Sequence, residues 1–172
     1  MELNGMDLTS LPPLVFAFRE GASDGFAKVA NLETLIRPEG GLWTSPRSPT
    51  GSAWTDFLEA PDEVGLPSVH AGKYTGFVAV EVPADARIYM VDTMEDLDRL
   101  VATYPLKPGT RMHGTAPDWE TMANDGWDAV YVSEAGIAAN GQRIPGIGRP
   151  SLAQWDCASV LWLNETFRLV EL

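Results

Sequence analysis

Cysteine is almost absent from this sequence of 172 residues. Cys157 is the only one, so no disulfide can form within the chain. Chains without disulfides are typical of reducing compartments, and we therefore expect a cytoplasmic protein. Histidine is nearly as rare, with only His70 and His113 present. Because these few residues show no spacing typical of zinc ligands, the sequence predicts no metal site.

Positive charge is also scarce. Twelve Lys and Arg residues stand against 24 Asp and Glu, which gives a formal net charge of −12. A field of that sign repels nucleic acids and anionic lipids, so we expect direct binding to neither. A small anionic ligand is still compatible with this charge, because it responds to the local field of a few arginines. An acidic decoy for nucleic-acid-binding proteins is a weaker hypothesis, because acidic and basic residues alternate without a long acidic run.

Long apolar runs are missing as well. No segment approaches the roughly 20 apolar residues that cross a bilayer, so we expect no membrane partner. Residues 1–11 contain two acidic residues and no basic cluster, which is not the pattern of a signal peptide. The chain also lacks repeats, a P-loop, a GxSxG elbow, an HExxH motif and a CxxC pair.

The residues that are present are those of a folded globule. Apolar residues make up 45 % of the chain and charged residues 21 %. The 13 prolines and 16 glycines are scattered as turn residues, so residues 1–172 are expected to form one domain. Strand-like and helix-like segments follow one another without regular βαβ alternation. This order predicts an α+β fold with a mixed, mainly antiparallel sheet and short packed helices.

Apolar alternation and turn residues predict the strands. Pro46 is expected to end the second strand, a turn at 83–85 to join the third and fourth, and a turn at Asn164-Glu165 to form a final hairpin. The predicted strands are 14–18, 42–45, 76–82, 87–91, 127–132, 160–163 and 167–170.

Capping residues and helical spacing predict four short helices. The best marked has Thr93 and Asp96 as a capping box, followed by apolar residues at i, i+3, i+4 and i+7. The others are expected after Ser23, around 54–58, and from Pro117 to Gly126. The helix after Ser23 would carry Phe26, Val29 and Leu32 on one face. Residues 140–150 are rich in Gly and Pro and are expected to form a loop.

The six tryptophans give the best indication of a site. Tryptophan packs in cores but also lines pockets for flat ligands. Trp43 and Trp155 differ from the others because each is beside polar residues at the edge of a predicted strand. Gly40-Gly41 precedes Trp43, and glycines suit a backbone that approaches another group closely. Asp156 follows Trp155; its carboxylate either binds a ribose hydroxyl or a cationic transition state, or caps local amides.

The segment GGLWTSP at 40–46, paired with WDCAS at 155–159 before a strand, resembles a family of small uncharacterised bacterial and phage proteins. That family is distantly similar to the ADP-ribosyltransferase fold. The resemblance implies a split sheet and NAD as the substrate, with a protein as a possible acceptor of ADP-ribose. It implies that Arg19, on the first strand, holds NAD, and that Trp43, Thr44 and Ser45 line the nicotinamide pocket.

The same resemblance implies a catalytic Glu at the start of a late strand. Ser159 stands at that position here, which is a departure from the family pattern. Asp156 precedes it by three residues, and Glu134 follows the predicted strand 127–132, so either could supply the missing carboxylate.

Two functional hypotheses follow. The first is an enzyme that cleaves the nicotinamide glycosidic bond of NAD and transfers or hydrolyses ADP-ribose. The second is a catalytically inert module on the same scaffold that binds a protein partner, which the missing Glu favours. Both histidines are interpreted as solvated, although His113 has the chemistry of a general base.

Overall fold

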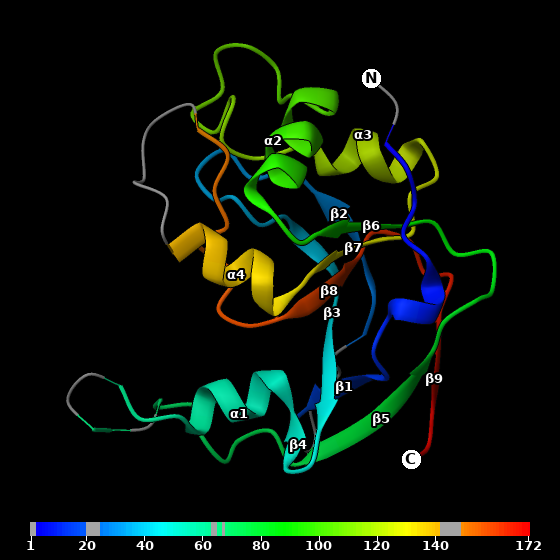
Figure 1. Ribbon diagram of the computed structural model, residues 1–172, viewed down its shortest axis with the longest axis vertical. Coiled ribbons are helices and arrows are strands. Elements are labelled where there is room, and N and C mark those ends of the chain that lie inside the picture. Colours follow the sequence, from blue (N-terminus) through cyan, green and yellow to red (C-terminus); the bar gives the residue numbers. More distant parts are fainter. Residues whose placement is uncertain (1–2, 20–24, 63–64, 67, 142–148) are drawn as a thin grey trace.

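The computed structural model describes residues 3–19, 25–62, 65–66, 68–141 and 149–172 (Figure 1). It confirms the predicted class, an α+β fold with a mixed, mostly antiparallel open sheet and a few short helices. The sheet has the strand order β6-β7-β8-β3-β1-β5-β9, and β2 and β4 also pair with β3. The strands are β1 (Leu14–Phe18), β2 (Ala27–Ala30), β3 (Glu39–Ser48), β4 (Gly51–Ser52), β5 (Gly76–Glu81), β6 (Ile88–Val91), β7 (Ala129–Val132), β8 (Ser159–Trp162) and β9 (Arg168–Val170).

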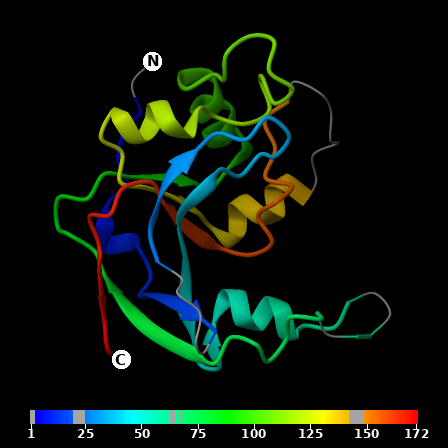
Figure 2. The same cartoon turned by 180° about the vertical axis from the view of Figure 1, so that it is seen from behind.

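The long strand β3 joins two parts of this sheet. Its residues Leu42, Trp43 and Thr44 pair with β8, whereas Ser45 and Pro46 pair with β1. The β6–β7–β8 part contains the one parallel pair among the described strands, β6 with β7. Figures 1 and 2 show β3 running from this part to the β1–β5–β9 part. The point where β3 changes partner is therefore a junction, and the candidate site lies there.

The helices are distributed unequally over the two parts. Most of them, α2 (Met94–Thr103), α3 (Trp119–Asn124) and α4 (Glu134–Gly141), lie on the side of β6, β7 and β8, whereas α1 (Ala53–Glu59) lies beside β4 (Figures 1 and 2). A short 3-10 helix, η1 (Leu8–Ser10), precedes β1. The predicted capping box of α2 is confirmed, because Thr93 and Asp96 satisfy each other's backbone N–H groups. This cap and the buried side chains of Leu97, Leu100 and Val101 explain why α2 was predictable.

Apolar side chains form one core cluster under α2 and α3 and a second on the opposite face of the sheet. The first contains Trp119, Trp127 and Trp155, and the second contains Phe16, Trp162 and Phe167. Most tryptophans therefore have a packing role. Within the described ranges, no helix is both long enough and apolar enough to span a membrane.

The helix predicted after Ser23 is wrong. Ser23 itself lies outside the described residues, and Ala27–Ala30 forms the strand β2, which pairs with β3. In this strand only Val29 is buried, so the three-residue spacing of Phe26, Val29 and Leu32 did not mark a helix face. Pairing with β3 stabilises an extended backbone here.

The turn predicted at 83–85 is confirmed, because the Ala86 N–H donates to the carbonyl oxygen of Pro83, but the strands on its two sides do not pair with each other. The two strands of the predicted final hairpin also exist but do not pair with each other. Strand β5 pairs with β1 and β9, whereas β6 pairs with β7. Strand β8 pairs with β3 and β7, whereas β9 pairs with β5. In each case the connection passes from one part of the sheet to the other, which local turn residues cannot reveal.

Smaller differences concern element ends. Strand β3 continues through Pro46 to Ser48, and the predicted loop 140–150 begins inside α4, with residues 142–148 outside the described part of the chain. Pro117 precedes the N-cap of α3, which is Asp118, so it is not the first helical residue. Gly126 does follow α3 with a φ of +81°, as expected for a residue at which a helix stops.

Candidate functional site

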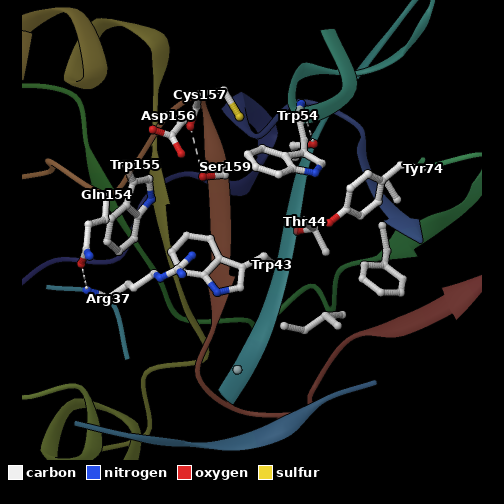
Figure 3. Close-up of a pocket in the computed structure, with 15 residues that line it drawn as sticks. Arg37, Trp43, Thr44, Trp54, Tyr74, Gln154, Trp155, Asp156, Cys157 and Ser159 are labelled. Carbon is white, nitrogen blue, oxygen red and sulfur yellow. Dashed lines mark hydrogen bonds between the residues drawn. The ribbon is translucent and has the colours of Figure 1, made fainter. Parts of the chain in front are cut away.

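A pocket of about 380 Å³ lies at the junction where β3 leaves β8 and pairs with β1. This volume is in the range of small-molecule sites, about 300–1,000 Å³. The side chains that line the pocket come from β1, β3, α1, β8 and the segment before β8, with Arg37 and Tyr74 added from loops (Figure 3). The labelled members are Arg37, Trp43, Thr44, Trp54, Tyr74, Gln154, Trp155, Asp156, Cys157 and Ser159.

Aromatic rings form two opposite sides of this pocket. On one side, Trp43 and Trp155 meet edge to face, with their ring centroids 4.7 Å apart and an interplanar angle of 64°. On the other side, Trp54 and Tyr74 meet edge to face at 6.0 Å and 85° (Figure 3). Rings arranged in this way present flat surfaces to a ligand. The pocket can therefore accept a planar group between or against them.

Arg37 is the one cationic side chain among the described residues that line the pocket. Its backbone is anchored, because the N–H groups of Ile36 and Arg37 both donate to Gln154 Oε1, at 2.7 and 3.1 Å. Its guanidinium is exposed and has no hydrogen bond or ion pair to any described residue. Arg37 can therefore meet a ligand anion without first breaking an internal contact. Sequence reasoning missed Arg37, whose only signal is its place three residues before Gly40-Gly41.

Asp156 is the one carboxylate among the described lining residues. It is exposed, and its side chain has no hydrogen-bond partner within the described residues. Next to it, burial raises the pKa of the Cys157 thiol to about 12, with further contributions from the charges of Asp156, Asp56 and Glu134. A thiol with such a pKa stays protonated at neutral pH and is a poor nucleophile. Asp156, and not Cys157, is therefore the reactive candidate in this segment.

The three predicted hydroxyl residues line the pocket but are engaged with the scaffold. Thr44 Oγ1 accepts from Trp162 Nε1 at 3.0 Å, and Ser45 Oγ accepts from the backbone N–H of Trp54 at 3.3 Å. Ser159 Oγ donates to the carbonyl oxygen of Cys157 at 3.1 Å. All three residues are buried. Their contacts hold β3 against β8, α1 against β3, and the turn before β8.

Arg19 and Glu134 do not line this pocket. The Nη2 atom of Arg19 donates to Tyr74 Oη at 3.3 Å, and its Cζ lies 4.9 Å from the centroid of the Tyr74 ring. Arg19 thus supports a residue of the pocket. Glu134 begins α4 and lines a separate hollow, and Cys157 lines both spaces. The pocket therefore brings together Trp43, Thr44, Ser45, Asp156 and Ser159, but neither Arg19 nor Glu134.

The two histidines lie away from the pocket. His113 Nδ1 is 2.6 Å from the carbonyl oxygen of Leu106, a contact in which the ring nitrogen donates. His70 is exposed on the loop before β5. In the ranges that the structure describes, no group of three or more Asp, Glu, His or Cys residues is arranged to hold a metal ion.

Comparison with known proteins finds no matching family model, no matching curated protein and no matching solved structure.

Proposed function

We propose that the pocket binds NAD and cleaves its nicotinamide glycosidic bond, so that ADP-ribose passes to an acceptor or to water. One observation carries the proposal: two aromatic sides, a guanidinium and a carboxylate meet in one pocket, and neither charge is paired within the described residues. NAD presents a flat cationic pyridinium ring, an anionic pyrophosphate, and a ribose carbon that gains positive charge as the bond breaks. Each of these groups has a matching partner in the pocket.

Binding would rest on Arg37 and Trp43. A guanidinium forms charge-assisted, often bidentate hydrogen bonds with phosphate oxygens, and Arg37 is free to do so. The half-buried Trp43 indole offers its face to the pyridinium ring, which adds a cation–π attraction to stacking. Arg37 therefore takes the role that the resemblance implied for Arg19, whose guanidinium lies over Tyr74.

Cleavage would rest on Asp156. When the C–N bond breaks, its electron pair moves to the nicotinamide nitrogen, which becomes neutral, and the positive charge moves to the ribose. A carboxylate beside the ribose stabilises that charge, and more strongly once the ligand has excluded water from the exposed Asp156. Water or an acceptor nucleophile then bonds to the ribose carbon and releases a proton. Ser159 cannot serve as this carboxylate, and its hydroxyl already donates to Cys157.

The resemblance to ADP-ribosyltransferases supports the same assignment. Its two anchoring segments, 40–46 and 155–159, are distant in sequence, yet residues from both line this pocket. The division of the sheet at β3 is compatible with the split sheet of that fold.

The test is calorimetric titration with NAD together with chromatographic detection of released nicotinamide. We expect Arg37→Gln to weaken NAD binding by roughly 10- to 100-fold, the usual effect of losing a hydrogen bond to a charged group. We expect Asp156→Asn to bind NAD within about threefold of wild type but to release nicotinamide at least 100-fold more slowly. Arg111→Gln and Asp85→Asn, exposed residues outside the pocket, are the matched controls. Absence of both NAD binding and nicotinamide release in the wild-type protein would refute the proposal.

A second candidate is the inert binding module. Two observations favour it: the hydroxyls of Thr44, Ser45 and Ser159 are engaged with the scaffold. Asp156 is also the one acidic side chain among the described lining residues. Such a module would bind NAD without releasing nicotinamide, or would bind a protein while ignoring NAD. Capture of one stoichiometric protein partner, undiminished by Arg37→Gln and Asp156→Asn, would favour this candidate over the enzyme.

A further inference from the structure

Trp155 carries an orphaned polar atom. Its indole Nε1 is the one buried side-chain nitrogen or oxygen in the described part of the chain that has no hydrogen-bond partner. The residue is 5 % exposed and lines the pocket. The large majority of buried side-chain polar atoms in proteins are paired, because a buried donor without an acceptor is unfavourable. This N–H therefore requires an explanation.

The other buried tryptophans show that the fold supplies acceptors for indoles elsewhere. Trp119 Nε1 donates to the carbonyl oxygen of Ile36 at 2.8 Å, and Trp127 Nε1 donates to Tyr104 Oη at 3.0 Å. Trp162 Nε1 donates to Thr44 Oγ1 at 3.0 Å. Among these buried indoles, the one without an acceptor is the one that lines the pocket.

The orientation of the Trp155 ring is fixed by its neighbours. It stacks on Trp119 at a centroid distance of 5.7 Å and an interplanar angle of 30°, and it meets Trp43 edge to face. The backbone N–H of Trp155 donates to the carbonyl oxygen of Leu152 at 2.8 Å. Figure 3 shows the indole nitrogen on the edge of the ring that is turned toward Trp43, inside the group of lining side chains. The donor is thus held in place and directed inward.

We propose that Trp155 Nε1 donates a hydrogen bond to a carbonyl oxygen of the ligand, which in NAD is the carboxamide oxygen of nicotinamide. This inference rests on the proposed function. Nε1 is buried, so a neighbouring side chain must move aside as the nicotinamide ring enters, and Trp43, whose half-buried ring meets Trp155 edge to face, is adjacent to it. Trp155 then determines specificity, because a pyridine ring without the carboxamide leaves its N–H unsatisfied.

The test replaces Trp155 with 3-benzothienyl-alanine, an isostere in which sulfur takes the place of the indole N–H. Two ligands are titrated by calorimetry: NAD, and the same dinucleotide with pyridine in place of nicotinamide. We expect wild-type protein to bind NAD at least about tenfold more tightly than the pyridine analogue, which corresponds to about 1.4 kcal/mol. We expect the isostere to bind both ligands within about threefold of each other.

The ligand-free protein provides an independent readout. Removing an unsatisfied donor should raise the Tm of the Trp155 isostere by a few degrees, whereas the same replacement at Trp119 should lower it by breaking the bond to Ile36. In spectra of ¹⁵N-indole-labelled protein, the Trp155 N–H signal should move downfield when NAD is added, as expected for a new hydrogen bond.

The outcomes separate this inference from the proposed function. If NAD binds and the preference for the carboxamide is unchanged in the isostere, the role of Trp155 is refuted and the NAD site stands. If the isostere loses stability as the Trp119 control does, Nε1 already has a partner, such as the face of Trp43, and the inference also fails. If wild-type protein neither binds NAD nor releases nicotinamide, the proposed function fails and the Trp155 inference falls with it.

Discussion

Replacement of Gly41 with alanine tests how closely β3 must approach β8 beside the pocket. Gly41 has a φ of +71°, and an added Cβ would lie 2.6 Å from Leu161 Cδ1 and 2.7 Å from the carbonyl oxygen of Trp162. The Leu161 methyl group can rotate away. The Trp162 carbonyl cannot, because it belongs to the backbone of β8, so the two strands must separate locally.

Gly72 is the matched control for this substitution. Its φ is +70°, but nothing lies within 4 Å of an added Cβ. At both positions the left-handed backbone costs alanine about 1–2 kcal/mol, offset by about 0.4–1 kcal/mol from the stiffer unfolded chain. We therefore expect Gly72→Ala to lower the free energy of unfolding by about 0–1.6 kcal/mol. Gly41→Ala should lose about 1–3 kcal/mol more than this control, the range for overpacking a close contact.

Urea unfolding followed by tryptophan fluorescence measures both free energies. The expected difference corresponds to a Tm lower by roughly 2–4 °C for each kcal/mol in a chain of this size. Equal stability of the two variants, within about 0.5 kcal/mol, would refute the reasoning, because it would mean that the strands move apart without loss.

Four further predictions concern the scaffold around the pocket. Cys157 should react with iodoacetamide at pH 8 far more slowly in the folded than in the urea-unfolded protein; equal rates would contradict its raised pKa of about 12. Because that pKa lies above the ordinary value of 9.0, the thiol's contribution to stability is present below pH 9 and lost as the pH rises toward 12, and Cys157→Ser should reduce this alkaline loss. Asn31→Ala should lower the free energy of unfolding by about 1–3 kcal/mol, because Asn31 Nδ2 donates to Asp118 and Oδ1 accepts from the Trp119 backbone N–H; an unchanged urea midpoint would show that these bonds contribute nothing. Ser52→Ala should lower the free energy of unfolding by about 0.5–2 kcal/mol through loss of the α1 N-cap, and Ser52→Gly should lower it by less. Equal losses in the two variants would contradict the capping role of Ser52.

Local sequence patterns predicted those helices and strands that are stabilised by contacts between residues close together in the chain. Helix α2 was predictable because its capping box and apolar face are encoded within a dozen residues. The glycines at 40 and 41 were recognised as sites of close approach, and both have positive φ with a neighbouring backbone oxygen within 3.0 Å of an added Cβ. Strand β2 was mistaken for a helix because it depends on pairing with β3, a contact that its own sequence does not encode.

In the candidate site, too, some residues could be predicted from the local sequence and others could not. Trp43 and Asp156 could be identified as site candidates from the sequence, because each lies next to the edge of a predicted strand. An aromatic or charged residue at such a position stands out from its neighbours in the chain. Arg37, Gln154 and Tyr74 were not, because each lies in a loop of ordinary composition and enters the pocket only through the path of the folded chain. The backbone N–H of Arg37 in particular donates to Gln154, which is 117 residues away in sequence.

By itself, the sequence determined the fold class, most strands, the best-capped helix, and the two segments that meet at the pocket. These follow from apolar spacing, caps and turn residues, which act over a few residues. The tertiary structure alone decided which strands pair, that Arg19 supports Tyr74 while Arg37 reaches the pocket, and that one indole N–H lacks an acceptor. Those features arise from contacts between distant segments, and hydrogen-bond partners and strand neighbours are chosen only when the whole chain has folded.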